Sequence, residues 1–177
     1  MDGARVDAAL LRLMELQRRG GISPKLPDTA DWYEVMLFPA AVENEIALAL
    51  ATIGRDLPAD FIRFWECSNG ANLFLNDSGL HGVGIASTGR IGELQRDEEK
   101  FYGAAALAPY AVFGRVNGAG DFLVFELETG RVLDGVHAEQ PSEWRPIAEN
   151  FTEWLERFTD ASGRYYWIEA LYEAPQG

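Results

Sequence analysis

The sequence predicts a single α+β domain, and three observations lead to that prediction. The chain has 177 residues, which is the length of one domain. Hydrophobic residues make up 47% of it and aromatic residues 12%, enough to form a substantial core. Apolar residues recur at helical spacing towards both ends of the chain, whereas short apolar runs alternate with turn residues in the middle. Helices, then an antiparallel run, then further helices are typical of the α+β class.

Residues 4–18 predict the first helix. Its apolar side chains recur at helical spacing and include Val6, Ala9, Leu10, Leu13 and Met14. Arg18 and Arg19 followed by two glycines suit a helix C-terminus. A proline-punctuated connector follows, so residues 1–39 are predicted to form a helical arm with its connector. Two arrangements stay open: the helix packs on its own chain, or it pairs with a second copy in a homodimer.

Two helices are predicted next. One begins at Pro39, which suits the first helical position, and ends at Gly54. The stretch LPADFIRFWECSNGANLF, residues 57–74, then restarts the chain as a short helix. The aromatic side chains that recur on one side of that helix are Phe61, Phe64 and Trp65. Asn69 and Gly70 are expected to end it, because both tolerate the left-handed conformation.

After Gly70 the apolar residues no longer recur at helical spacing but form short runs separated by turn residues. Five short strands are therefore predicted. They are residues 72–75, 79–86, 110–116, 121–128 and 131–138. The best hairpin candidate joins the last two strands through Thr129 and Gly130. Residues 90–109, between the second and third strands, are expected to be helical at first and irregular afterwards.

Two more helices are predicted at the C-terminal side. The first opens at Pro146, and the apolar residues at helical spacing in it are Ile147, Phe151, Leu155 and Phe158. The second, residues 164–174, is crowded with aromatic side chains. Tyr165, Ile168, Leu171 and Tyr172 are expected to pack inward, while Tyr166 and Trp167 stay partly open.

The chain is strongly acidic, with 28 Asp and Glu against 15 Lys and Arg and a formal charge of −13. Such a chain repels phosphate backbones, so nucleic-acid binding is not expected. It is attracted to basic surfaces, and that attraction speeds encounter at low salt. No signal peptide is recognised, and no run approaches the roughly 20 apolar residues of a membrane span. With Cys67 as the single cysteine, a cytoplasmic protein without disulfides or membrane contact is predicted.

No motif predicts catalysis, a metal or a cofactor. Cys67 has no histidine tied to it in sequence and is interpreted as a small buried residue. His81 and His137 lack metal-ligand spacing and, in predicted strands, are interpreted as structural or surface residues. The loop GRVNGAGD, residues 114–121, lacks the lysine and hydroxyl that end a phosphate loop, so it predicts a turn between strands. An enzyme using unassigned carboxylates and the two histidines is the third hypothesis.

Taken together, these motifs resemble the SMI1/KNR4 family, part of the SUKH superfamily. The similarity runs through VENEIALALATIGRDLP, DFIRFWECSNGANLF, GVGI, FGRVNGAGDFLVFEL and IAENFTEWLERF, from Ala40 to Phe158. It implies a domain over residues 40–160 with a bent, mostly antiparallel sheet and packed helices. Residues 161–177 would be a C-terminal helical extension packed on it. The resemblance further implies a binding protein: many bacterial members look like immunity proteins that neutralise a toxin, and fungal members regulate the cell wall through protein contacts.

The resulting prediction is a non-enzymatic protein-binding domain, an immunity protein for a cognate toxin. The charge favours a basic toxin. The alternative is a regulatory adaptor of the same family, related to the cell wall or envelope. The acidic run of Asp97, Glu98 and Glu99 is interpreted first as a solvated face and second as a contact for a cationic partner. Tyr166 and Trp167 are interpreted first as core packing and second as interface anchors.

Overall fold

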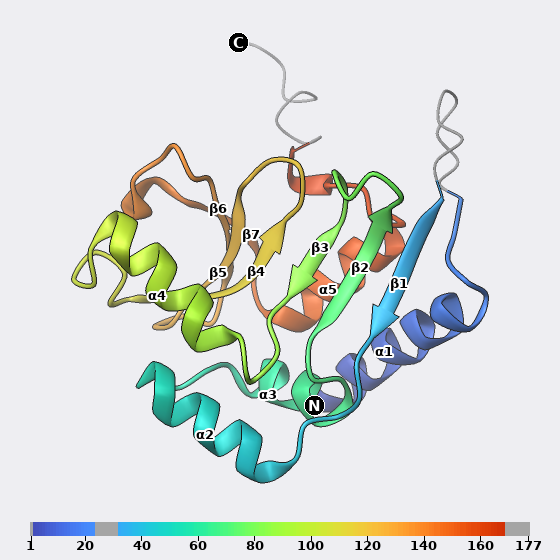
Figure 1. The fold of residues 1–177 in the computed structure, drawn as a ribbon, viewed down its shortest axis with the longest axis horizontal. Coiled ribbons are helices and arrows are strands. Elements are labelled where there is room, and N and C mark those ends of the chain that lie inside the picture. Colours follow the sequence, from blue (N-terminus) through green and yellow to red (C-terminus); the bar gives the residue numbers. More distant parts are fainter. Residues whose placement is uncertain (1, 24–31, 169–177) are drawn as a thin grey trace.

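The structure is a computed structural model, and it describes residues 2–23 and 32–168. In these residues one antiparallel sheet has seven strands, which neighbour one another in chain order (Figure 1). The strands are β1 (Tyr33–Leu37), β2 (Ala71–Asn76), β3 (Val83–Ile85), β4 (Tyr110–Val116), β5 (Phe122–Glu126), β6 (Val132–Gly135) and β7 (Arg145–Ala148). The helices are α1 (Asp2–Arg18), α2 (Glu43–Ile53), α3 (Ala59–Cys67), α4 (Ile91–Tyr102), α5 (Phe151–Asp160) and the 3₁₀ turn η1 (Pro141–Glu143). The α+β prediction is confirmed.

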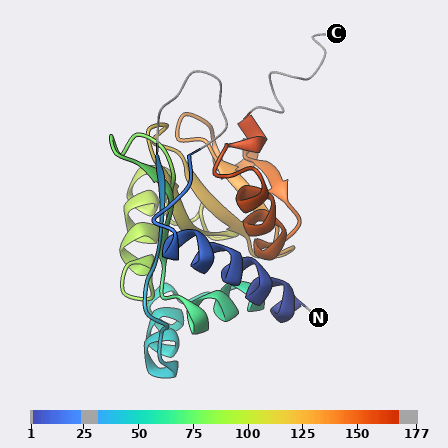
Figure 2. The same cartoon turned by 90° about the vertical axis from the view of Figure 1, so that its right-hand side faces the viewer.

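The helices lie on both sides of the sheet (Figure 2). α1, α3 and α5 pack on one face and enclose the main core. Its largest fully buried side chains include Phe61, Phe64, Trp65, Phe113, Phe125, Phe151 and Trp154. Burying each of them contributes about 2–3 kcal/mol to folding. On the other face, α4 and the segment before β7 cover a smaller cluster formed by Leu107, Val112, Phe122, Val124, Leu133 and Trp144.

The aromatic stretch that contains α3 is structural, as predicted. Phe61, Phe64 and Trp65 are all fully buried. The Trp65 indole N–H donates to Ala86 O at 2.9 Å and so ties α3 to the end of β3. Gly70 has φ 89°, and a Cβ there would lie 2.9 Å from Ile85 O. Only glycine therefore suits the point where the chain leaves α3 and enters the sheet.

Two predicted helix starts are wrong. α2 begins at Glu43 rather than at Pro39, because Pro39 O accepts a hydrogen bond from Asn69 N and is held against the end of α3. α5 begins at Phe151, where Asn150 Oδ1 caps the helix by accepting from Glu153 N at 2.8 Å. Pro146 lies in β7, a strand at the edge of the sheet, where proline is tolerated.

Side chains reach main-chain groups at both edges of the sheet. At β1, Gln17 Oε1 accepts from Leu37 N at 2.6 Å. At β7, Ile147 O accepts from Arg157 Nη1 at 3.0 Å and from the Tyr166 hydroxyl at 3.1 Å. Natural sheets commonly protect their edge strands by such covering contacts.

The N-terminal elements share the core of the rest of the chain. Val6, Leu10 and Leu13 of α1 are buried in the main core, and β1 pairs with β2. The division into residues 1–39, 40–160 and 161–177 stays a prediction. The N-terminal part does not pack independently, because α1 and β1 belong to the same core and sheet as the rest of the described chain.

Candidate functional site

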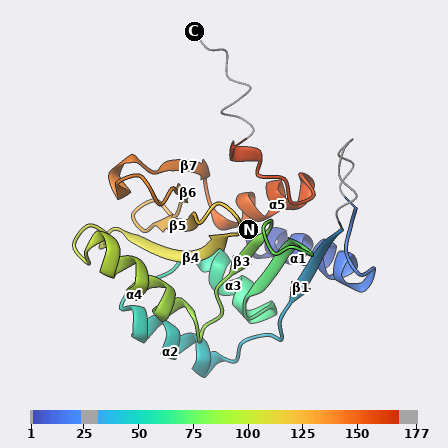
Figure 3. The ribbon, with the colours of Figure 1, turned by 45° about the horizontal axis from the view of Figure 1, so that its top comes forward.

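One cross-strand row shows where the second face of the sheet is covered and where it is open. The residues directly opposite one another on successive strands are Met36, Asn72, Gly84, Arg115, Phe122 and Gly135. Opposite residues of antiparallel strands share a face. Phe122 is fully buried, whereas Met36 and Arg115 are exposed. This face is therefore covered at β5 and open over β1–β3, where none of the described helices crosses the strands (Figures 1 and 3).

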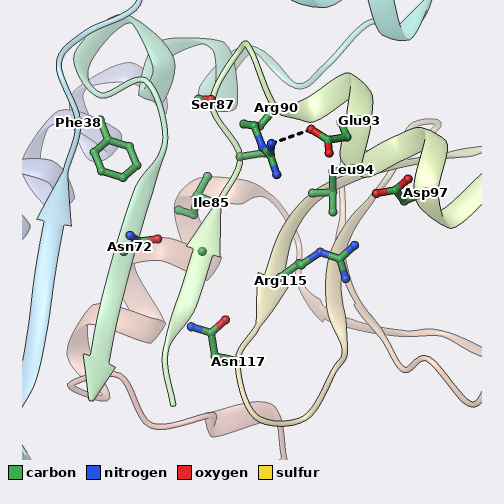
Figure 4. Close-up of a pocket in the computed structure, with 12 residues that line it drawn as sticks. Phe38, Asn72, Ile85, Ser87, Arg90, Glu93, Leu94, Asp97, Arg115 and Asn117 are labelled. Carbon is green, nitrogen blue, oxygen red and sulfur yellow. Dashed lines mark ion pairs between the residues drawn. The ribbon is translucent and has the colours of Figure 1, made fainter. Parts of the chain in front are cut away.

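A groove of about 360 Å³ lies on this open half, beside α4 (Figure 4). Asn72 and Gly84 are its floor, and Arg115 and Asn117 stand on the β4 side. Arg90, which precedes α4, and Glu93 and Asp97 from its first two turns line the wall above β4, on the same side as Arg115. The groove thus combines residues of β2, β3, α4 and the end of β4. The sequence prediction missed Asn72, Gly84 and Arg115.

A bulge in β4 helps to place the α4 wall. The register of β4 against β5 shifts between Val112 and Gly114, and Gln95 Oε1 of α4 accepts from Val112 N at 2.9 Å. Gln95 Nε2 donates in turn to Glu99 Oε1 at 3.0 Å, which also accepts from Arg55 Nη2 at 2.7 Å. α4 is therefore fixed to the sheet and to the loop before α3 by buried or partly buried polar contacts.

The three residues of the acidic run, for which a partner contact was one interpretation, have different surroundings in the structure. Glu98 is only 4% exposed and accepts from Arg115 Nη2 at 3.0 Å, so a solvated face is the wrong interpretation for it. Glu99 is held by Arg55. Asp97 alone is exposed and lines the groove. A hydrogen bond from Lys100 at 2.9 Å lowers the pKa of Asp97, so its charge is already balanced within the chain.

The aromatic pair near the C-terminus packs more tightly than predicted. Trp167 is 5% exposed and its ring lies 5.8 Å from that of Phe158, so the expectation that it stays partly open is wrong. Tyr166 is half-buried, with the Arg157 guanidinium 4.0 Å from its ring centre. Burial raises the pKa of Tyr166. A partner contact by this pair stays a prediction, and Leu171 and Tyr172 lie outside the described residues.

Asp134 is a buried carboxylate near that segment, with 2% exposure. Arg145 donates to its Oδ2 at 3.2 Å. Among the described residues, its Oδ1 and the Trp167 indole nitrogen have no partner at hydrogen-bond geometry, although both are buried. The indole N–H of Trp167 nevertheless acts to lower the pKa of Asp134. Burial first, and the charge of Asp121 second, raise the pKa of Asp134 to about 6 against the opposing effect of Arg145. This side chain therefore changes protonation in mildly acidic solution.

Cys67 is exposed at the end of α3, so its interpretation as a buried residue is wrong. Its Sγ lies 3.8 Å from Asp7 Oδ1. Desolvation by the surrounding chain raises the pKa of the Cys67 thiol, and the charge of Arg63 only partly opposes it. A nucleophilic cysteine needs the opposite shift.

Both histidines lie in turns rather than in strands, contrary to prediction. The His81 ring stacks between Tyr33 and Tyr165, with both centroid distances 4.5 Å, and its Nε2 lies 2.8 Å from Gly163 O. His137 stacks on Phe101 at 4.4 Å. Across residues 2–23 and 32–168, no three His, Cys, Asp or Glu side chains gather as a metal site would need. The helices in that part of the chain include none long and apolar enough to cross a membrane.

Comparison with known proteins gives one result that bears on this site. The family model of the SMI1 / KNR4 family (SUKH-1) matches residues 40–157, two thirds of the chain. The match includes α4 and β2–β4, which form most of the groove. No curated protein matches the chain. The chain belongs to the SMI1/KNR4 family (SUKH-1), which fits a domain of the protein-interaction or immunity type.

Proposed function

We propose that the protein is a non-enzymatic binding domain of the immunity type, which neutralises a cognate toxin in the cytoplasm by covering part of its surface. Family membership over residues 40–157 is the observation that carries this proposal. The formal charge of −13 supports a basic toxin as the partner.

The distribution of charge supports the same proposal. Many positive side chains are already engaged within the chain; Arg5 pairs with Glu156, and Arg12 with Asp160. Exposed carboxylates that make no ion pair with a described residue include Glu34, Glu43, Asp56, Asp77, Glu128 and Glu149. The surplus negative charge is therefore at the surface, where it attracts a basic protein over a distance of about 10 Å at moderate salt.

The predicted contact residues take different parts in this proposal. Asp97 lines the groove and would meet the partner directly. Glu98 and Glu99 would act by holding α4 against Arg115 and Arg55. Tyr166 and Trp167, on the far side of the sheet from α4, would be a second contact region through the exposed part of Tyr166.

Affinity capture in a salt series tests the proposal. The tagged full-length chain is used as bait in a lysate of its source organism, and bound proteins are identified by mass spectrometry after washes of rising salt. We expect a basic protein that is released as salt screens the attraction. That protein, expressed alone, should inhibit growth, and co-expression of this chain should restore it.

Two outcomes contradict the immunity proposal. One is capture of acidic proteins only, or no capture at all. The other is a captured protein that leaves growth unaffected; if it acts in envelope synthesis, the adaptor alternative is favoured. The isolated chain should also show no turnover in a broad hydrolase screen. Metal-dependent turnover that is lost in His81→Ala would support the enzyme hypothesis instead.

A further inference from the structure

The floor of the groove contains a glycine that the fold does not require. A Cβ on Gly84 would meet only Asn72 Oδ1, at 3.6 Å, which is ordinary van der Waals contact. Gly135 in the same cross-strand row is different, because a Cβ there would lie 2.4 Å from the Phe122 ring. A strand glycine that packing does not demand often marks a place where another molecule approaches the main chain closely.

Polar groups around this floor have hydrogen-bonding capacity to spare. The side-chain amides of Asn72 and Asn117 are half-buried and make no hydrogen bond with a described residue. Within the described part of the chain, Arg115 donates to Glu98 through Nη2, and its other N–H groups are not engaged there. An amide matches the donor and acceptor of a peptide group, and a guanidinium matches a carboxylate.

The charge around the groove differs from that of the chain as a whole. Arg90 and Arg115 line the groove, Arg96 lines the adjoining pocket towards α2, and Lys100 pairs with Asp97 of its wall. The neighbouring carboxylates are already paired: Glu93 with Arg90, Asp97 with Lys100 and Glu98 with Arg115. Arg96 makes no ion pair with a described residue and lines the continuation of the groove towards α2. The lining of the groove is therefore balanced in charge, so an incoming carboxylate meets less repulsion there than the net charge of −13 implies.

We propose that the groove binds an extended segment of the protein partner through an acidic side chain. The carboxylate is bound by Arg115 and Arg90. The main chain of the segment lies across Gly84 and hydrogen-bonds to the amides of Asn72 and Asn117. This inference rests on the proposed protein-binding function and specifies it: a partner that is basic overall carries an acidic anchor at this position.

A random dodecapeptide library displayed on phage tests the inference without knowledge of the partner. The library is selected on the full-length chain and counter-selected on Gly84→Leu, whose side chain fills the floor. We expect the enriched peptides to carry Asp or Glu. A synthetic enriched peptide should bind about tenfold more weakly, or worse, when that acid is replaced by glutamine. Arg115→Gln should abolish the difference between the two peptides.

Arg131→Gln is the matched control. Arg131 is paired with Glu126 at the β5–β6 turn, as Arg115 is with Glu98, but it does not line the groove. This variant should keep the full preference for the acidic peptide. Thermal unfolding establishes that each variant is folded; if Gly84→Leu is not, Arg115→Gln replaces it in the counter-selection.

Three results would overturn the inference: no enrichment, enrichment of Lys and Arg, or an acidic preference that survives Arg115→Gln. Capturing the partner from the lysate with the wild-type chain and with Gly84→Leu distinguishes failure of the groove inference from failure of the proposed binding function. If Gly84→Leu still captures the partner of the wild-type chain, the groove is not the contact, and the protein-binding function stands. If the wild-type chain captures no partner, it is the binding function that fails.

Discussion

Asp60 Oδ2 accepts hydrogen bonds from both the main-chain N–H and the hydroxyl of Thr152, at 2.8 and 2.9 Å. Asp60 lies in the first turn of α3 and Thr152 in the first turn of α5, and both are buried. The other oxygen, Oδ1, accepts from Phe61 N at 3.0 Å. One carboxylate therefore satisfies main-chain N–H groups at the starts of two helices, where negative charge is favourable.

Replacing Asp60 should destabilise the fold. Asp60→Ala leaves the N–H and hydroxyl of Thr152 without an acceptor, so we expect the free energy of unfolding to fall by about 3 kcal/mol. Asp60→Asn keeps one acceptor oxygen and should lose less. Urea denaturation measures both. Asp56→Ala, at an exposed acid in the preceding loop, is the control and should change stability by less than about 0.5 kcal/mol. Equal effects at the two positions would contradict the shared-carboxylate account.

Adding a methyl group should have different effects at two glycines of one cross-strand row. Gly135→Ala forces a Cβ into the Phe122 ring, and such overpacking costs about 1–3 kcal/mol. Gly84→Ala meets only an ordinary contact and should be neutral or slightly stabilising, because alanine reduces the freedom of the unfolded chain. Thermal unfolding of the two variants makes the comparison. A comparable loss at Gly84 would mean that the fold does require a glycine there.

Asp134 should lower stability as pH rises through mildly acidic values. Its pKa is about 6 in the folded chain and 3.8 without the fold, so between these values the folded chain retains the proton longer. Stability from this group is therefore fully present below about pH 4 and is lost as the pH rises through about 6. Relative to wild type, Asp134→Asn should gain stability over this window, by about 3 kcal/mol at most. Urea denaturation across the pH range measures it, with Asp77→Asn as an exposed control. A stability difference between Asp134→Asn and wild type that does not vary with pH would contradict the raised pKa of Asp134.

Self-association through α1 stays a prediction that point variants can test. Leu11 and Met14 lie one turn apart on α1, 66% and 57% exposed. If they form a homodimer interface, Leu11→Glu with Met14→Glu should convert the dimer into a monomer in multi-angle light scattering. Leu48→Glu, at an exposed residue of α2, is the control. A wild-type chain that is monomeric at high concentration would exclude the dimer. Deleting the whole helix is a poorer test, because it removes part of the core.

Local periodicity predicted most helices and central strands, whereas the two edge strands were missed. β1 follows a proline-rich connector. Its residues form a strand because they pair with β2, which lies more than thirty residues further along the chain. β7 was assigned to a helix because Pro146 suits a first helical position and Ile147 continues the spacing of α5. The N-cap at Asn150, three residues before Glu153, was the stronger local signal.

The groove could not be predicted, because strand register brings its residues together. Asn72, Gly84 and Arg115 become neighbours only when β2, β3 and β4 pair. The local signal for the groove in the sequence was Gly84 inside GVGI, because a glycine within a strand can mark the close approach of another group. The acidic run on α4 illustrates a second limit: successive helical residues point about 100° apart, so Asp97, Glu98 and Glu99 have different surroundings.

The covered edges of the sheet affect how this protein can recognise anything. With Leu37 N bonded to Gln17 and Ile147 O to Arg157 and Tyr166, main-chain groups that an incoming strand would use at those positions are occupied. Donor-strand exchange and edge-templated fibre growth are disfavoured there. At those two positions, side chains rather than free main-chain groups are available to another molecule, and side chains can be exchanged without altering the ladder. Exposed side chains on such a scaffold are therefore free to vary while the pairing of its strands is kept.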